Sequence, residues 1–209
     1  MNVHTRRFRA AGPAGAIEAL RDEPAAGLAR RGTAVIAHPH PLFGGTMENK
    51  VVQTLARAFV QSGWVAIRFN FRGVGATEGV HDEGRGELDD MLALVASEAP
   101  DGPLALAGFS FGSFVASRAV AALWPTRRAE KVVLVGTAAA RFEVANLPAE
   151  AHDATLVIHG EHDDTVPLAA VLDWARPQTL PVTVVPGGGH FFHGQLPLLK
   201  SLVARHLRS

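Results

Sequence analysis

The sequence predicts a doubly wound α/β fold, in which helices cover both faces of a mostly parallel sheet. Short apolar runs rich in β-branched residues alternate along the chain with stretches in which apolar residues recur at helical spacing. This alternation is typical of βα units. Hydrophobic residues form 47% of the 209-residue chain and charged residues 19%, which is an ordinary balance for a globular protein. We therefore expect a single domain over residues 1–209.

The predicted sheet begins with a hairpin over residues 5–21, whose arms flank the turn sequence Gly12-Pro13-Ala14-Gly15. Six further strands follow, each a short apolar run. They cover residues 33–37, 64–69, 104–107, 131–135, 155–159 and 181–185. Because helical segments separate most of these strands, we expect them to pair in parallel.

Helices are predicted between and after the strands. They cover residues 49–61, 86–98, 111–123 and 195–206, and another helix is expected to begin near Pro167. In the first two, apolar residues recur at spacings of three, four and seven, so each helix has one apolar face that suits packing on the sheet.

The charge balance gives no indication of a nucleic-acid or membrane partner. Twenty Lys and Arg residues offset twenty Asp and Glu residues, whereas surfaces that bind nucleic acids or anionic lipids usually carry a basic excess. The chain has no cysteine, which excludes disulfides and thiolate chemistry. No apolar run reaches the roughly 18 residues of a membrane helix. The first dozen residues lack the apolar core of a signal peptide, so a cytoplasmic protein is expected.

A Gly-x-Ser-x-Gly motif follows the predicted strand 104–107. It consists of Gly108-Phe109-Ser110-Phe111-Gly112. In this motif the serine lies on a tight turn between a strand and a helix, and the small residues on either side leave room for the turn. The N-terminus of the helix directs free N–H groups toward the carbonyl that the serine attacks. We interpret Ser110 as a nucleophile and Phe111 as an oxyanion donor; the alternative is a structural glycine-rich turn.

A serine nucleophile needs a general base, and the base needs an acid that fixes its tautomer. The adjacent residues Asp163 and Asp164 follow the fifth of the six strands, and His190 follows the sixth. This is the chain order Ser, acid, His that the motif requires. His193 competes as the base but lies closer to a helix start. Taken singly, each residue has a structural alternative, because Asp163 and Asp164 could cap the helix that begins near Pro167 and a histidine is common in loops.

In proteins with this Gly-x-Ser-x-Gly motif, the loop after the first parallel strand supplies a second oxyanion donor. It consists of His38-Pro39-His40-Pro41-Leu42-Phe43-Gly44-Gly45-Thr46. Proline has no N–H, so the candidate donors are His40, Leu42 and Phe43. The alternative is a stiff structural loop that leads into a helix capped by Thr46. Catalysis by a metal is less favoured. The pairs His38/His40 and His159/His162 resemble metal ligands, but Leu42 occupies the position of the aspartate in an HxHxD metal cluster.

Five segments carry a family resemblance that extends over nearly the whole chain. They are HPHPLFGGTMENKVV (38–52), FNFRGVGATEG (69–79), GFSFGS (108–113), GEHDDTVP (160–167) and GGGHFFHG (187–194). The sequence thereby resembles small bacterial α/β-hydrolases related to dienelactone hydrolases. The resemblance implies an α/β-hydrolase fold without cofactor or metal. It implies Ser110, Asp163 and His190 as the catalytic triad, and Leu42 and Phe111 as oxyanion donors. Dienelactone hydrolases use a cysteine nucleophile, so a serine at this position favours ester over lactone hydrolysis.

No lid domain is predicted, because only residues 136–154 separate two consecutive strands. We expect an open site and therefore a carboxylic ester hydrolase for small molecules with short or medium acyl groups, active as a monomer or homodimer. A thioesterase or peptidase with the same triad is one alternative, and a non-catalytic binding module is another. Five phenylalanines are candidates either for an acyl pocket or for core packing. They are Phe43, Phe109, Phe111, Phe191 and Phe192.

Overall fold

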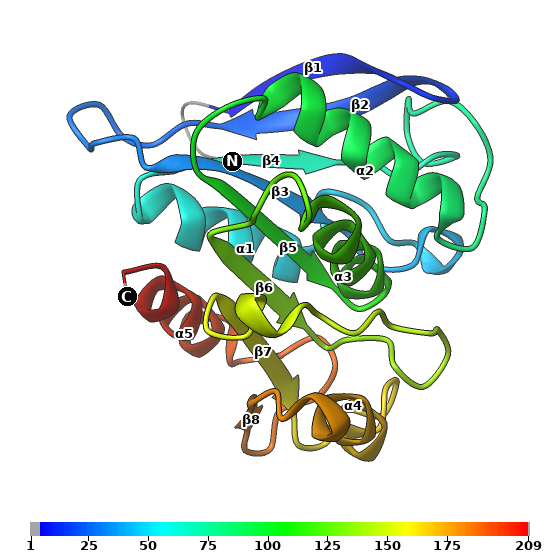
Figure 1. Cartoon of the computed structure of the whole chain (residues 1–209), viewed down its shortest axis with the longest axis vertical. Helices are drawn as coiled ribbons and strands as arrows, with labels where there is room; N and C mark the ends of the chain where they lie inside the picture. The colour runs from blue at the N-terminus through cyan, green and yellow to red at the C-terminus, as the bar shows by residue number, and fades with distance from the viewer. Residues whose placement is uncertain (1–4, 209) are drawn as a thin grey trace.

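The computed structural model describes residues 5–208, which contain an eight-stranded sheet with helices on both faces (Figure 1). The strands are β1 (Thr5–Gly12), β2 (Gly15–Asp22), β3 (Gly32–Ala37), β4 (Trp64–Phe69), β5 (Leu104–Phe109), β6 (Lys131–Val135), β7 (Thr155–Gly160) and β8 (Val182–Val185). Their order across the sheet is β1-β2-β4-β3-β5-β6-β7-β8. The predicted fold class is confirmed.

The sheet combines an antiparallel edge with a parallel body. β1 and β2 form the predicted hairpin, and β2 pairs antiparallel with β4. From β4 onward every neighbouring pair is parallel. The carboxyl ends of β3, β5, β7 and β8 therefore lie at one edge of the sheet, which is where parallel α/β sheets place their sites.

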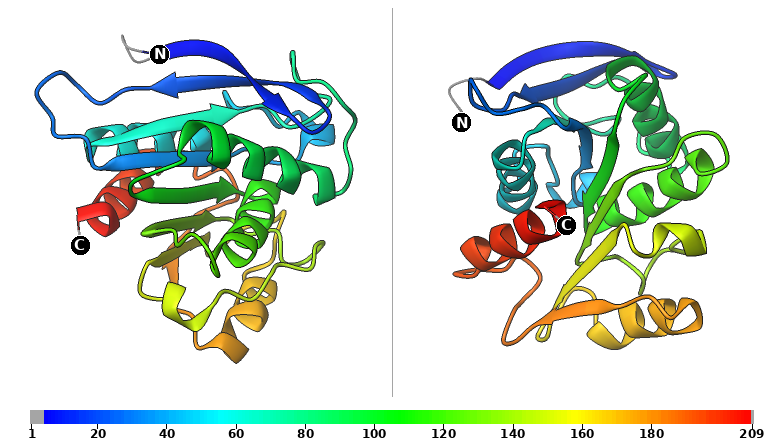
Figure 2. Two further views of the ribbon diagram at one scale, coloured as in Figure 1. Left: turned by 45° about the horizontal axis from the view of Figure 1, so that its top comes forward. Right: turned by 60° about the vertical axis from the view of Figure 1, so that its left-hand side comes forward.

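Five α-helices of the described chain cover the two faces of the sheet. They are α1 (Lys50–Gln61), α2 (Arg85–Glu98), α3 (Phe111–Leu123), α4 (Leu168–Ala175) and α5 (Leu196–Arg208). Two views of the ribbon place α1 and α5 on one face and α2, α3 and α4 on the other (Figure 2). The connection between β6 and β7 contains only the short 3-10 helix η2 (Ala149–Ala151), so the expected absence of a lid is confirmed.

Each face of the sheet has its own hydrophobic core. Along β5, Leu104 and Leu106 pack in the core under α2 and α3, whereas Ala105, Ala107 and Phe109 pack in the core under α1 and α5. Side chains alternate between the two faces of a strand. A central strand buried on both faces therefore requires a continuous apolar run, which is the signal that located these strands.

Two predicted helix caps are wrong. The side chain of Asn49, not that of Thr46, accepts a hydrogen bond from the Val51 N–H (2.8 Å) and caps α1. At α4 the N-cap is Pro167, and no side chain caps the helix. Asp164 therefore has no capping role, because its carboxylate accepts only from the neighbouring Thr165 hydroxyl (3.3 Å).

No helix within residues 5–208 is both long enough and apolar enough to span a membrane.

Candidate active site

Ser110 lies on the sharp turn between β5 and α3. Its backbone has φ 56° and ψ −117°, a conformation that costs a residue with a side chain about 1–3 kcal/mol and persists only where the surroundings hold it. The Ser110 N–H donates a hydrogen bond to the Val135 carbonyl of β6 (2.8 Å). This bond fixes the turn to the neighbouring strand, as expected of a nucleophile elbow.

The two glycines of the motif are required by close main-chain contacts. A Cβ at Gly108 would lie 2.1 Å from the carbonyl oxygen of Gly112, and a Cβ at Gly112 would lie 2.3 Å from the carbonyl oxygen of Ala37. Neither clash can be relieved by moving a side chain. The first turn of α3 thus packs against the end of β3, which brings the loop after β3 beside Ser110.

Three predicted site residues meet at the carboxyl edge of the sheet. The Nε2 atom of His190 lies 3.0 Å from the Ser110 hydroxyl oxygen, and its Nδ1 atom lies 2.7 Å from Oδ2 of Asp163. Both distances are within hydrogen-bonding range. His190 is 4% exposed and Asp163 is 6% exposed, so this chain of contacts is shielded from water.

Asp163 rather than Asp164 faces the histidine. Oδ1 of Asp163 accepts the N–H groups of Thr165 (3.0 Å) and Val166 (2.7 Å), which leaves Oδ2 for His190. Burial raises the pKa of Asp163, but the hydrogen bonds from His190 and from the Val166 N–H outweigh it and hold this pKa below its ordinary value. The carboxylate is therefore ionised at neutral pH.

His193, the competing base, is exposed and has its ring 6.0 Å from that of Phe191. His190 is the histidine that contacts Ser110.

The loop after β3 offers one unoccupied N–H among the three predicted candidates. The Leu42 N–H donates to Nδ1 of His40 (3.2 Å), and the Phe43 N–H donates to the His40 carbonyl (3.2 Å). No acceptor for the His40 N–H or the Phe111 N–H is found within residues 5–208. The N–H of Leu42 is thus already bonded within the 3-10 helix η1 (Pro41–Phe43), whereas that of His40 is unoccupied within the described chain.

His38 has a structural role. Its Nε2 accepts from the Phe71 N–H (2.9 Å), and its Nδ1 lies 2.6 Å from the Pro39 carbonyl. Both ring nitrogens are thus engaged in joining the loops after β3 and β4, and burial lowers the pKa of His38 to about 4. Among residues 5–208, no three His, Asp or Glu side chains are grouped as metal ligands.

The five phenylalanines divide between the core and the rim of the site. Phe109, Phe111 and Phe192 are at most 1% exposed and pack in the two cores. Phe43 is 73% exposed and Phe191 is 43% exposed. Only these two remain candidates for substrate contact.

Ser110 itself is 8% exposed. The expected open serine is therefore only partly correct. No lid covers the site, but the elbow and its neighbouring loops bury most of the residue.

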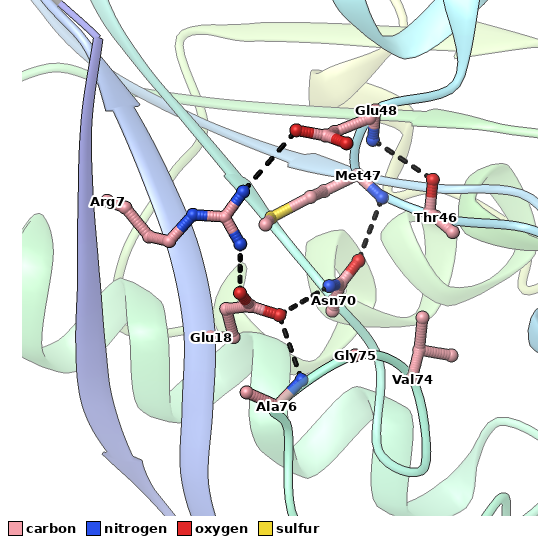
Figure 3. A pocket seen from close by; sticks show the side chains of 9 residues that line it. All are labelled: Arg7, Glu18, Thr46, Met47, Glu48, Asn70, Val74, Gly75 and Ala76. Atoms are coloured by element: carbon pink, nitrogen blue, oxygen red, sulfur yellow. Dashed lines mark hydrogen bonds and ion pairs between the residues drawn. The ribbon is translucent and has the colours of Figure 1, made fainter.

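A pocket of about 410 Å³ opens between the N-terminal hairpin and the loops after β3 and β4 (Figure 3). Glu18 accepts hydrogen bonds from the Asn70 side chain (2.8 Å) and the Ala76 N–H (2.9 Å). Glu18 also forms an ion pair with Arg7, and Asn70 accepts from the Met47 N–H (2.9 Å). These contacts join β2 to both loops. The pocket is lined by no residue of the Ser110 site. We interpret the hydrogen bonds and the ion pair of Glu18 as structural contacts that hold the loop after β3 in place.

Sequence reasoning considered His159, the penultimate residue of β7, only as a possible metal ligand and missed its contact with Asp163. Its Nε2 atom lies 3.4 Å from Oδ2 of Asp163. The one available signal was its place, a histidine at the end of an apolar strand and four residues before the acid.

The eight-stranded sheet, the elbow and the Ser–His–Asp contacts define the architecture of an α/β hydrolase. A family model for α/β hydrolases matches residues 74–173. An α/β serine hydrolase without a lid from Xanthomonas campestris is 35% identical, with a TM-score of 0.88, and the alignment covers 100% of this chain and 95% of that one. The chain belongs to the α/β-hydrolase family.

Three further proteins are similar to this chain. An α/β serine hydrolase homologue from Coxiella burnetii is 34% identical, with a TM-score of 0.82 and coverage of 99% and 98% of the two chains. The Est1E protein of Butyrivibrio proteoclasticus, whose structure holds ferulic acid, is 17% identical with a TM-score of 0.81 and coverage of 96% and 98%, and shares the fold. An uncharacterized protein of Rickettsia prowazekii is 41% identical over 91 residues, which are 42% of this chain and 38% of that relative's length.

Proposed function

We propose that this protein is a serine hydrolase that cleaves carboxylic esters through an acyl-enzyme intermediate. The observation that carries the proposal is the continuous contact from the Ser110 hydroxyl through His190 to Asp163, with distances of 3.0 Å and 2.7 Å. A serine hydroxyl is a weak nucleophile until a base accepts its proton, and the base works best when an acid fixes its tautomer.

In the acylation step, the Ser110 oxygen attacks the ester carbonyl carbon while its proton passes to Nε2 of His190. The carbonyl oxygen gains the negative charge of a tetrahedral intermediate. When this intermediate collapses, the bond to the alcohol oxygen breaks, and the alcohol leaves with the proton held by His190. In the deacylation step, a water molecule gives one proton to His190 as its oxygen attacks the acyl carbon, which forms a second tetrahedral intermediate. When this intermediate collapses, the bond from the acyl carbon to the Ser110 oxygen breaks, that oxygen takes the proton from His190, and the carboxylic acid is released.

Throughout the cycle Asp163 remains ionised and stabilises the imidazolium form of His190. The low pKa of Asp163 supports this role.

The N–H groups of Phe111 and His40 are the proposed oxyanion donors. Phe111 directly follows Ser110 in the chain, and the ring of His40 is 4.9 Å from the ring of Phe111, which brings residue 40 to the same end of α3. Free N–H groups that are already oriented stabilise an oxyanion without the cost of reorganisation, and each such donor contributes about 10²–10³ to kcat.

Short and medium acyl esters are the proposed substrates. The loops around Ser110 carry exposed apolar side chains, namely Leu42, Phe43 and Phe191, which suit contact with a small apolar group. Residues 5–208 include no lid that could enclose a long acyl chain. We expect kcat/KM for p-nitrophenyl esters to peak at short or medium acyl length and to show no jump at the micelle concentration. A steady rise to sixteen carbons would contradict this substrate class.

The basic test is hydrolysis of p-nitrophenyl acetate by wild-type protein and Ser110→Ala. The variant should lose kcat by at least about a hundredfold and keep the thermal stability of the wild type. Parallel assays with a thioester and a peptide separate the related alternatives, since the triad supports all three reactions. A folded wild-type protein that cleaves none of them would favour a non-catalytic binding module.

A further inference from the structure

A second histidine contacts the proposed catalytic acid. His159 belongs to β7, and its side chain is fully buried. Its Nε2 atom lies 2.9 Å from the Val166 carbonyl and 3.4 Å from Oδ2 of Asp163. The same oxygen of Asp163 accepts from His190. Two imidazoles therefore converge on one carboxylate oxygen, and only one of them reaches Ser110.

The surroundings of His159 determine which of its nitrogens carries a proton. Nε2 faces two acceptors, a carbonyl and a carboxylate, so it must be the donor. Nδ1 is buried with no hydrogen-bond partner within the described chain, and a proton there would be an unsatisfied buried donor. Burial lowers the pKa of His159, which agrees with a neutral ring protonated on Nε2 alone.

We propose that His159 is a positioning residue that shares its Nε2–H between Val166 and Asp163 and so holds the Asp163 carboxylate against His190. The role rests on the proposed hydrolase function, since it acts through the triad. His159 touches neither Ser110 nor a reacting atom.

The hydrogen bonds around Val166 connect His159 to the position of the Asp163 carboxylate. Val166 is held through both of its main-chain polar groups, because its N–H donates to Oδ1 of Asp163 (2.7 Å) and its carbonyl accepts from His159. The segment from Asp163 to Val166 is thus linked to the imidazole of His159 at two points, by a hydrogen bond at the Val166 carbonyl and by the 3.4 Å contact at Oδ2 of Asp163. Without that imidazole the carboxylate keeps its N–H partners on Oδ1 but loses the second donor that limits the rotation of Oδ2. Loss of a side chain that orients a site residue by hydrogen bonding typically lowers activity about 10–100-fold.

Two substitutions of His159 distinguish a role as a hydrogen-bond donor from a role in packing alone. His159→Leu keeps an apolar side chain of similar size but has no donor, and His159→Gln offers an amide N–H at about the same reach as Nε2. His152→Leu is the matched control, because Nε2 of His152 also lies near a backbone carbonyl, that of Leu147 (3.3 Å), and does not contact Asp163. His159→Phe is a second variant without a donor, for use if the leucine variant does not fold.

Two measurements are made on each folded variant. The first is kcat and KM for p-nitrophenyl acetate. The second is the downfield ¹H NMR signal of the His190 Nδ1 proton, which is assigned by its disappearance in Asp163→Asn. This signal reports the hydrogen bond between His190 and Asp163 even if the protein hydrolyses no ester, so a failure of the proposed function is distinguishable from a failure of this proposal.

We expect His159→Leu to lower kcat about 10–100-fold with KM within about twofold, and to broaden the Nδ1 proton signal through faster exchange with water. His159→Gln should restore most of kcat and most of the sharpness of the Nδ1 proton signal. His152→Leu should match the wild type in both measurements. The proposal is overturned if His159→Leu leaves the proton signal unchanged, or if the glutamine and leucine variants lose kcat equally, because either result would mean that His159 only fills space.

Discussion

Gly136 lies beside His190: a Cβ built at Gly136 would lie 3.3 Å from Cε1 and 3.4 Å from Nδ1 of the imidazole, and 3.1 Å from Cε2 of Phe109. Gly136 also has φ +55°, a conformation that disfavours residues with a Cβ by about 1–2 kcal/mol. The end of β6 thus supplies a surface against which the histidine ring packs, and the absence of a side chain there determines how closely the ring approaches.

We predict that Gly136→Ala lowers kcat about tenfold, because a shift of a few tenths of an ångström in His190 lengthens its contact with Ser110. Gly102→Ala is the control, since Gly102 has φ +72° with no atom near its Cβ position. Thermal unfolding should show a similar loss of stability in both variants, and kinetics should show a loss of kcat only at Gly136. Equal kcat in the two variants would contradict this role of Gly136.

Asp163 and Asp164 should respond very differently to substitution by asparagine. Asp163→Asn is expected to lower kcat by about 10³–10⁴, because the amide favours the wrong tautomer of His190. Asp164→Asn should change neither kcat nor stability by more than about 0.5 kcal/mol, since the exposed carboxylate caps no helix. Steady-state kinetics and urea unfolding measure both effects. Loss of activity in Asp164→Asn alone would reverse the assignment of the acid.

The proposed oxyanion donor at residue 40 is testable because its backbone accepts proline. His40 has φ −51° and ψ 122°, which is compatible with a proline ring. His40→Ala removes the ring and keeps the N–H, whereas His40→Pro removes both. We expect the proline variant to have a kcat about 10²–10³ below that of the alanine variant. Should the two be equally active, the second donor must come from elsewhere.

The ion pair and hydrogen bonds of Glu18 should make stability depend on pH. Burial raises the pKa of Glu18, but hydrogen bonds from Ala76, Asn70 and Arg7 outweigh it and lower this pKa below its ordinary value of 4.5. A carboxylate with a lowered pKa in the folded state contributes full stability above its ordinary pKa and loses it as the pH falls through the folded-state pKa.

Glu18→Gln should therefore cost about 1–3 kcal/mol at pH 7, and its difference from the wild type should narrow toward pH 3. Urea unfolding at pH 7, 5 and 3 measures this difference, and the exposed Glu143→Gln is the control. A difference that stays constant down to pH 3 would show that the charge of Glu18 contributes nothing to stability.

The sheet, its hairpin and the positions of Ser110 and His190 were predictable because their signals are local. The buried strands are continuous apolar runs, and the elbow needs glycines at fixed spacing. The predictions that failed depend on loop geometry. Whether Asn49 or Thr46 caps α1 depends on where the backbone turns into the helix, and the sequence shows only that both side chains are able to cap.

Which N–H groups of the loop after β3 are occupied by hydrogen bonds was likewise not predictable. The Leu42 N–H is occupied because η1 folds it back onto His40, and that turn is not apparent from residue types alone. The contact of His159 with Asp163 depends on how the loop after β7 returns over its own strand. The exposed fractions of the five phenylalanines similarly depend on tertiary packing, which a single sequence does not show.

The central claim, that Ser110 is an activated nucleophile, is tested most directly by covalent labelling with a fluorophosphonate and mass spectrometry of the intact and digested protein. The wild type should gain one adduct on the peptide that contains Ser110. Ser110→Ala and heat-denatured wild type should gain none, and the exposed-serine variant Ser97→Ala should label as the wild type does. Equal labelling of Ser110→Ala and the wild type, or a folded wild type that gains no adduct, would contradict the claim.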